Sequence, residues 1–151
     1  MLYFEDLNQA ALVIRGSYTL REEEIIAFAR QWDPQPFHID PAAAALSPLQ
    51  GLFASSVHTY AITSKLLSQL EPPIAAIAGI KHELEMPEPA RPGDILSLQI
   101  VLLDKRVSAS KPDRGLVSLA SELHNQAGNV VLRVRSLIMV KRRPAPHGAP
   151  A

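Results

Sequence analysis

The chain has 151 residues, with 15 basic and 15 acidic side chains and therefore no formal net charge. Without an excess of positive charge, binding to nucleic acid or to an acidic membrane surface is not expected. The chain contains no cysteine, which excludes disulfides, thiolate metal sites and a thiol nucleophile. Any chemistry must therefore use His, Asp, Glu, Ser or backbone groups.

The sequence predicts a cytoplasmic protein without a membrane segment. Residues 1–6 lack the basic start and long apolar core of a secretory signal, and no apolar run approaches the roughly 20 residues that span a bilayer. Residues 1–143 contain no internal repeat and no linker rich in Gly, Ser or Pro, so we expect a single domain. The tail, 144–151, has three prolines and no large apolar side chain, and it is predicted to be disordered.

The chain is predicted to begin with a short strand over 11–18, followed by a helix. Thr19 and Glu22 have the spacing of a capping box, in which a hydroxyl and a carboxylate satisfy backbone N–H groups at a helix start. The apolar residues that follow recur at helical spacing up to Trp32. We therefore expect the first helix to start at Thr19 and to end near Trp32.

Two further helices are predicted before the middle of the chain. Asp40 stands before a proline, a combination of N-cap and first-turn residue that predicts a short helix over 42–46. Ser47 repeats this pattern and predicts a longer helix over 48–70. That helix is apolar or small almost all round, with His58 as the one readily ionisable side chain in its middle, and such a helix is usually buried on most sides.

Everything after residue 73 reads as strand. Apolar and polar residues alternate, as in Leu96, Leu98 and Ile100, and turn residues separate the segments. The four predicted strands cover residues 74–86, 94–108, 115–126 and 129–142. The order of elements indicates an α+β domain in which a curved antiparallel sheet wraps around a central helix. Strands this long need cover for their exposed edges, so we expect a homodimer or a dimer of dimers.

An acid and an imidazole lie close together in the segment from Asp33 to His38. Prolines at positions 34 and 36 fix the backbone and reduce the entropy lost in presenting the two side chains. A carboxylate beside an imidazole can serve as an acid/base pair at neutral pH. The alternative is structural, with Asp33 capping a helix or pairing with an arginine and His38 packed in a loop.

These residues resemble the MaoC-like dehydratases and (R)-specific enoyl-CoA hydratases, a family with the hotdog fold. The resemblance rests on Asp33-x-Gln35-Pro36-x-His38, followed by Gly51-Leu52-x-Ala54-Ser55. The turns Arg91-Pro92-Gly93-Asp94 and 110–115 support it. Gln35 stands where the family usually has asparagine, and Ser56-Val57 replaces a frequent Gly-Trp pair.

The resemblance implies a hydro-lyase that needs no metal or organic cofactor. Asp33 and His38 match the acid/base pair that adds water to a trans-2-enoyl-CoA thioester to give a 3-hydroxyacyl-CoA. Ser55 matches a hydroxyl that lines the site, Gln35 lies within the same motif, and Gly51 lies where backbone N–H groups would receive the thioester oxygen.

Several alternatives stay open at this stage. A hotdog protein with these residues can also be an acyl-CoA thioesterase or a non-catalytic acyl-thioester binding protein. His58, one helical turn after Ser55, either faces the same cavity or packs in the core. Basic residues at 105–114 and 141–143 are either ordinary solvated charges or contacts for the phosphates of coenzyme A. No pattern of His and carboxylate residues predicts a metal site.

Overall fold

The computed structural model describes residues 1–144. It contains a 5-stranded antiparallel sheet with the strand order β1-β3-β4-β5-β2. The strands are β1 (Ser17–Thr19), β2 (Ala76–Glu85), β3 (Ile95–Val107), β4 (Arg114–His124) and β5 (Val130–Lys141). The helices are η1 (Phe4–Asp6), η2 (Gln9–Ala11), α1 (Glu22–Trp32), α2 (Pro36–Ile39), α3 (Pro41–Ala45) and α4 (Ser56–Leu67).

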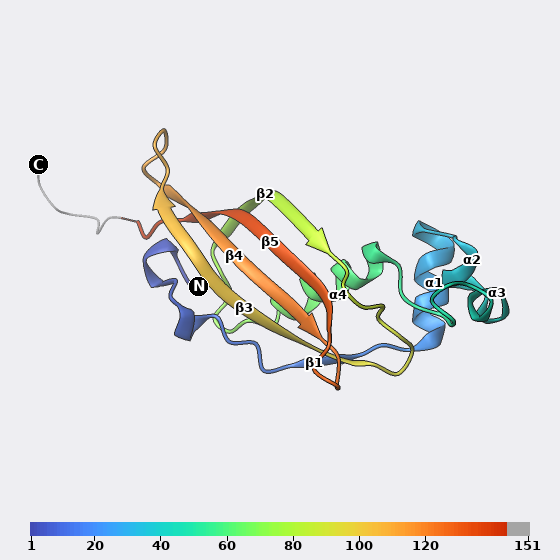
Figure 1. Ribbon diagram of the computed structural model, residues 1–151. Coiled ribbons are helices and arrows are strands. Elements are labelled where there is room, and N and C mark those ends of the chain that lie inside the picture. Colours follow the sequence, from blue (N-terminus) through green and yellow to red (C-terminus); the bar gives the residue numbers. More distant parts are fainter. Residues whose placement is uncertain (145–151) are drawn as a thin grey trace, which may run out of the picture.

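Helix α4 lies against one face of the curved sheet, in the arrangement of a hotdog fold (Figure 1). Alternate residues of β3 turn toward the helix, and Leu96, Leu98 and Ile100 are buried as their spacing predicts. Ile62 and Leu66 of α4 are buried in the same core. The four long strands and the central helix are therefore confirmed. For the strands, the alternation of apolar and polar residues determines which face of the sheet is apolar.

The predicted helix over 48–70 is wrong at its start, because α4 begins only at Ser56. Gln50 and Gly51 have φ values of 53° and 149°, backbone conformations that a right-handed helix cannot contain. Ser55 is the N-cap instead, and its hydroxyl accepts a hydrogen bond from the His58 N–H at 3.2 Å. Residues 46–55 thus form an irregular connection that leads into α4.

The first predicted strand is also too long, since β1 covers only Ser17–Thr19. Beyond the end of β1, a side chain pairs with the backbone groups of β3 instead. The Gln9 amide donates to the Ile100 carbonyl at 2.7 Å and accepts from the Leu102 N–H at 3.0 Å. One glutamine side chain therefore pairs with β3 beyond the end of β1, where the sequence predicts backbone pairing.

The two predicted helix caps differ in outcome. Helix α1 begins at Glu22 after Arg21, whose side chain makes no capping hydrogen bond, and Thr19 lies in β1. The predicted capping box is therefore wrong. Asp40 is confirmed as the N-cap of α3, where it accepts from the Ala42 N–H at 2.9 Å.

Helices α1, α2 and α3 lie together beyond one end of the sheet, whereas the N-terminus and the β3–β4 turn lie at the other end (Figure 1). Within residues 1–144, no helix has the length and apolar character that crossing a membrane requires. The tail for which disorder is predicted lies, from residue 145 onward, outside the described residues.

Candidate active site

Asp33 and His38 meet at the junction of α1 and α2. Asp33 follows the last residue of α1, and its N–H still donates to the Ala29 carbonyl at 2.8 Å. Pro36 starts the single turn of α2, which carries His38 as its third residue. The short connection brings Asp33 Oδ2 to 3.6 Å from His38 Nε2.

A backbone carbonyl sets the orientation of the His38 ring. His38 Nδ1 lies 2.8 Å from the Phe53 oxygen. Because a carbonyl can only accept, Nδ1 carries the proton in this hydrogen bond. The Phe37 and Phe53 rings also flank the imidazole, with centroids at 4.6 and 4.7 Å and steep interplanar angles. In the neutral imidazole, Nε2 is therefore an unprotonated acceptor that faces Asp33.

The separation of Asp33 and His38 suits a shared water. At 3.6 Å, Oδ2 and Nε2 are too far apart for a direct hydrogen bond. A water oxygen about 2.8 Å from each group would contact both of them. Since a carboxylate and an unprotonated nitrogen are both acceptors, such a water would donate one proton to each and direct its lone pairs outward.

Asp33 and His38 line a cleft of about 290 Å³. His38 is 4% exposed, whereas the side chain of Asp33 is 28% exposed, so the carboxylate lies nearer the opening. The other lining residues are mostly apolar and come from the segment before α4, from α4, from the β2–β3 connection and from β5. They are Leu49, Phe53, Ala54, Ser56, Thr59, Met86, Pro87, Glu88, Pro89, Ala90 and Val131.

The first turn of α4 lies beside this cleft. Ser56 is the first residue of the helix and lines the cleft. The first N–H groups of an α-helix have no acceptor within the helix, and they favour negative charge near them. The cleft therefore combines an acid, a base and an electropositive backbone on an otherwise apolar wall.

The comparisons with known proteins identify the family and the fold. A model of the MaoC like domain matches residues 5–122. The chain belongs to the MaoC-like dehydratase family. A crystal structure of the MaoC-like dehydratase from Rhodospirillum rubrum is 41% identical to this MaoC-like chain, with a TM-score of 0.87 over 96% of this chain and 100% of that chain.

Two more distant proteins extend the comparison. The R-hydratase PhaJ1 from Pseudomonas aeruginosa is 22% identical and has a TM-score of 0.72, covering 99% of this chain and 94% of that chain, a likeness of fold. The uncharacterized protein YdeM of Bacillus subtilis (strain 168) is 26% identical over 129 residues, which is 83% of this chain and 89% of YdeM.

The other predicted site residues of this MaoC-like protein lie outside the cleft lining. The Gly51 N–H donates to the Ala44 carbonyl at 2.9 Å, so it is not free to receive a thioester oxygen. Ser55 is fully buried and caps α4, between two residues that do line the cleft. Gln35 is exposed at the start of α2. The helix start places Ser56, rather than Gly51, at the cleft.

His58 is a buried histidine that packs between helices. Its ring stacks on Phe28 of α1, with centroids 4.4 Å apart and an interplanar angle of 8°. His58 Nδ1 is buried without a hydrogen-bond partner among the described residues. Burial lowers the pKa of His58 below its ordinary value of 6.5, although Glu24 nearby opposes this shift.

Several cleft residues have no motif that marks them in the sequence. Phe53 acts through its carbonyl, which any residue could supply, and Thr59 lies on the buried face of α4. Arg91 is marked only weakly in the sequence, since it belongs to a turn that is similar to one found in the family. Its guanidinium donates to the carbonyls of Leu49 and Leu52 and thereby fixes the segment that carries Phe53.

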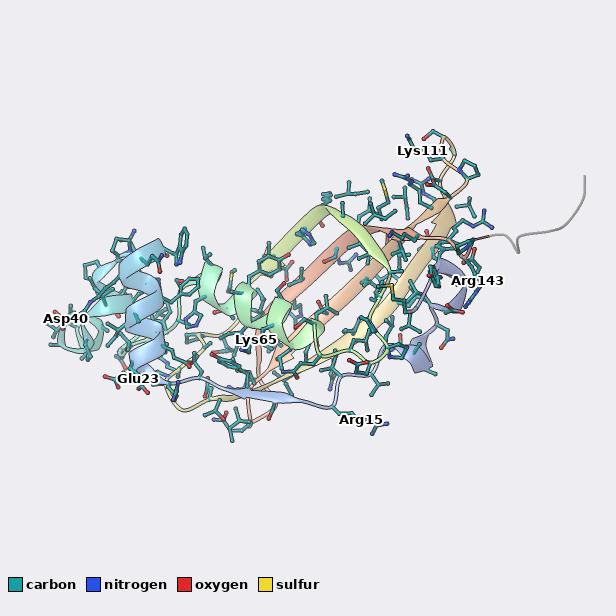
Figure 2. All side chains as sticks on the ribbon, turned by 180° about the vertical axis from the view of Figure 1, so that it is seen from behind. Arg15, Glu23, Asp40, Lys65, Lys111 and Arg143 are labelled. Atoms are coloured by element: carbon teal, nitrogen blue, oxygen red, sulfur yellow. The ribbon has the colours of Figure 1, made fainter. Side chains whose placement is uncertain are left out.

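The basic residues at 105–114 and 141–143 are not part of this cleft. Arg142 pairs with Glu5 and Arg143 pairs with Asp6, so both tie the N-terminal segment to the end of β5. Lys111 and Arg143 lie at the opposite end of the sheet from Asp40 and α3 (Figure 2). Within one chain they do not approach the acid/base pair. Residues 1–144 contain no cluster of three or more potential metal ligands.

The lowered pKa of His58 predicts a specific loss of stability in acid. Between the folded pKa and 6.5, the unfolded chain binds a proton at His58 that the folded chain does not. The free energy of unfolding therefore falls as pH drops below 6.5, and this contribution levels off below the folded pKa. His58→Phe should keep the stacking on Phe28 and remove this contribution.

Urea unfolding of both proteins between about pH 7.5 and about pH 5 measures the effect. The variant should lose less stability than the wild type over this range. Parallel curves would show that His58 takes up its proton as readily in the folded chain as in the unfolded chain.

Proposed function

We propose that this protein is a hydro-lyase that adds water to a trans-2-enoyl-CoA, or removes it from a 3-hydroxyacyl-CoA, with Asp33 and His38 as the acid/base pair. The observation that carries the proposal is the 3.6 Å separation of Asp33 Oδ2 and His38 Nε2 on the wall of an apolar cleft. The family membership and the names of the dehydratase and hydratase relatives support it.

The addition of water requires groups near the water oxygen that can accept one proton and deliver one proton. The water oxygen forms a bond to the β carbon, one water proton is taken up by the pair, and a proton passes from the pair to the α carbon. The net change is the addition of one water across the double bond, and the pair returns to its starting protonation. Asp33 and His38 together therefore hold the proton between these two transfers.

The developing negative charge on the thioester oxygen needs a donor. The N–H of Ser56, at the start of α4 and beside the cleft, takes this role in our proposal. This assignment replaces Gly51, whose N–H is already bonded to Ala44. Acid/base chemistry with a backbone donor needs no metal or organic cofactor.

The proposal includes a homodimer formed through β2. This strand pairs with β5 on one side, and all of its residues are exposed. Ile80 and Leu84 are 48% and 38% exposed on it, and an uncovered apolar edge strand invites pairing. A two-fold axis through His82 would place Lys81 of one copy opposite Glu83 of the other, an attractive cross-strand pair. The self-complementary charge favours a second copy as the partner.

Substitution of either member of the pair should abolish most hydratase activity. We expect Asp33→Asn and His38→Gln each to lower kcat by about a hundredfold or more, since each removes a proton-transfer group. Loss of the conjugated double bond of crotonyl-CoA, followed by its absorbance, measures this. Asp40→Asn is the matched control, because asparagine also caps a helix and Asp40 lies in the same segment.

Three results would contradict the proposal. The first is an Asp33→Asn protein that hydrates crotonyl-CoA at the wild-type rate. The second is release of free coenzyme A by the wild type without hydration of the double bond, which would identify a thioesterase. The third is the absence of turnover with every enoyl-CoA tested, which would identify a binding protein.

A charge on the free edge should dissociate the dimer. Sedimentation should give twice the chain mass for the wild type and one chain mass for Ile80→Lys at micromolar concentration, because with the axis through His82 the lysine of one copy would stand opposite the apolar Leu84 of the other. Ile95→Lys, which changes a similarly exposed isoleucine on β3, should remain dimeric. A dimeric Ile80→Lys protein would exclude β2 as the interface.

A further inference from the structure

A second cavity, of about 190 Å³, lies between α4 and the concave face of the sheet. Its walls come from α4 and from β2, β3, β4 and β5. The lining residues are Tyr60, Thr63, Ser64, Leu67, Gly79, His82, Leu98, Ile100, Leu119, Ser121, Val134, Ser136 and Ile138. None of them lines the cleft of Asp33 and His38.

The second cavity continues the line of the first one along the same two elements. Thr59 of α4 lines the cleft, and Thr63, one helical turn later, lines the second cavity. On β5, Val131 lines the cleft and Val134 lines the second cavity. These steps correspond to roughly 6 Å along a helix and roughly 10 Å along a strand. The second cavity therefore lies where the far end of an acyl chain held at the cleft would run.

Hydroxyl groups interrupt an otherwise apolar wall in this cavity. On β4, Leu119 is buried and Ser121 follows it on the same face, and on β5, Val134 is followed by Ser136. Strands that wrap a buried helix normally carry apolar residues at these positions. Tyr60 adds a phenol from α4, so the polar groups come from three different elements.

The polar groups of the cavity have spare hydrogen-bonding capacity. His82 Nδ1 and Ser136 Oγ are 2.9 Å apart. The ring of His82 lies over Gly79, where a Cβ would stand 2.5 Å from Nε2, so the glycine makes room for the imidazole. Within residues 1–144, the hydroxyls of Ser121 and Tyr60 make no hydrogen bond to the protein. Such groups need water or a ligand as a partner.

We infer that the second cavity receives the far end of the acyl chain and selects chains whose far end carries a hydrogen-bonding oxygen. This inference rests on the proposed function and names its substrate class. A purely alkyl chain would displace water and leave the hydroxyls of Ser121 and Tyr60 unpaired. A chain ending in an oxygen would satisfy them. A site built to bond a polar group rejects the analogue that lacks it much more strongly than it rejects a change in length.

Two substrates of equal length test this selection. The substrates are hex-2-enoyl-CoA and 6-hydroxyhex-2-enoyl-CoA, and the readout is kcat/KM from loss of the conjugated double bond. The wild type should prefer the hydroxylated substrate by about tenfold or more. The double variant Ser121→Ala with Ser136→Ala should lose most of this preference, because the hydroxylated substrate loses its partners and the alkyl substrate no longer leaves these hydroxyls unpaired.

Two further variants make the test specific. Ser118→Ala is the control, because Ser118 lies on β4 three residues before Ser121 but on the opposite face, outside the cavity. It should keep the wild-type preference. Tyr60→Phe removes one cavity hydroxyl without changing the volume appreciably, so it tests the inference even if the double variant folds poorly, and it should lower the preference.

The outcomes separate the inference from the function on which it rests. Wild-type turnover of both substrates with equal kcat/KM would overturn the inference and leave the hydratase proposal standing. A preference that survives in the double variant and in Tyr60→Phe would also overturn it. No turnover of either substrate, or of crotonyl-CoA, would contradict the proposed function and the inference together.

Discussion

The hydrogen bond from His38 Nδ1 to the Phe53 carbonyl is the interaction on which the proposed chemistry depends. It fixes the side of the imidazole that carries the proton and leaves Nε2 for Asp33 and the cleft. Without it, the ring could turn and present an N–H to the carboxylate, and the two groups would hydrogen-bond directly with no place for a water. The bond joins two segments 15 residues apart, so the structure between them has to be rigid.

The connection before α4 supplies this rigidity. Gly51 adopts a left-handed conformation, and Arg91 donates to the carbonyls on either side of it, at Leu49 and Leu52. A Cβ at position 51 would stand 3.0 Å from the Arg91 guanidinium, so glycine allows this close approach. The Ala54 N–H then donates to the Ala90 carbonyl at 2.9 Å. The functional side chain is on α2, but its orientation depends on a loop that the β2–β3 connection holds in place.

Much of the fold follows from short-range patterns in the sequence, whereas the site does so only in part. Alternation over four strands predicts the sheet, and the Asp40-Pro41 pair predicts α3. The sequence places the start of α4 too early because Ser47 and Ser55 are both acceptable N-caps, and the choice between them depends on Gly51 and its contact with Arg91. Asp33 and His38 could be nominated from spacing and family resemblance. The Phe53 carbonyl could not, since a backbone group leaves no signature in the sequence.

The protonation state of the two His38 nitrogens tests this account most directly. In ¹⁵N NMR of the histidine-labelled protein near neutral pH, His38→Gln identifies the signals of His38 by their loss. Whenever the ring is neutral, the hydrogen bond to Phe53 predicts a protonated Nδ1 and an unprotonated Nε2. A neutral ring with its proton on Nε2 would mean that Phe53 does not orient the imidazole, and it would contradict the shared-water arrangement of Asp33 and His38.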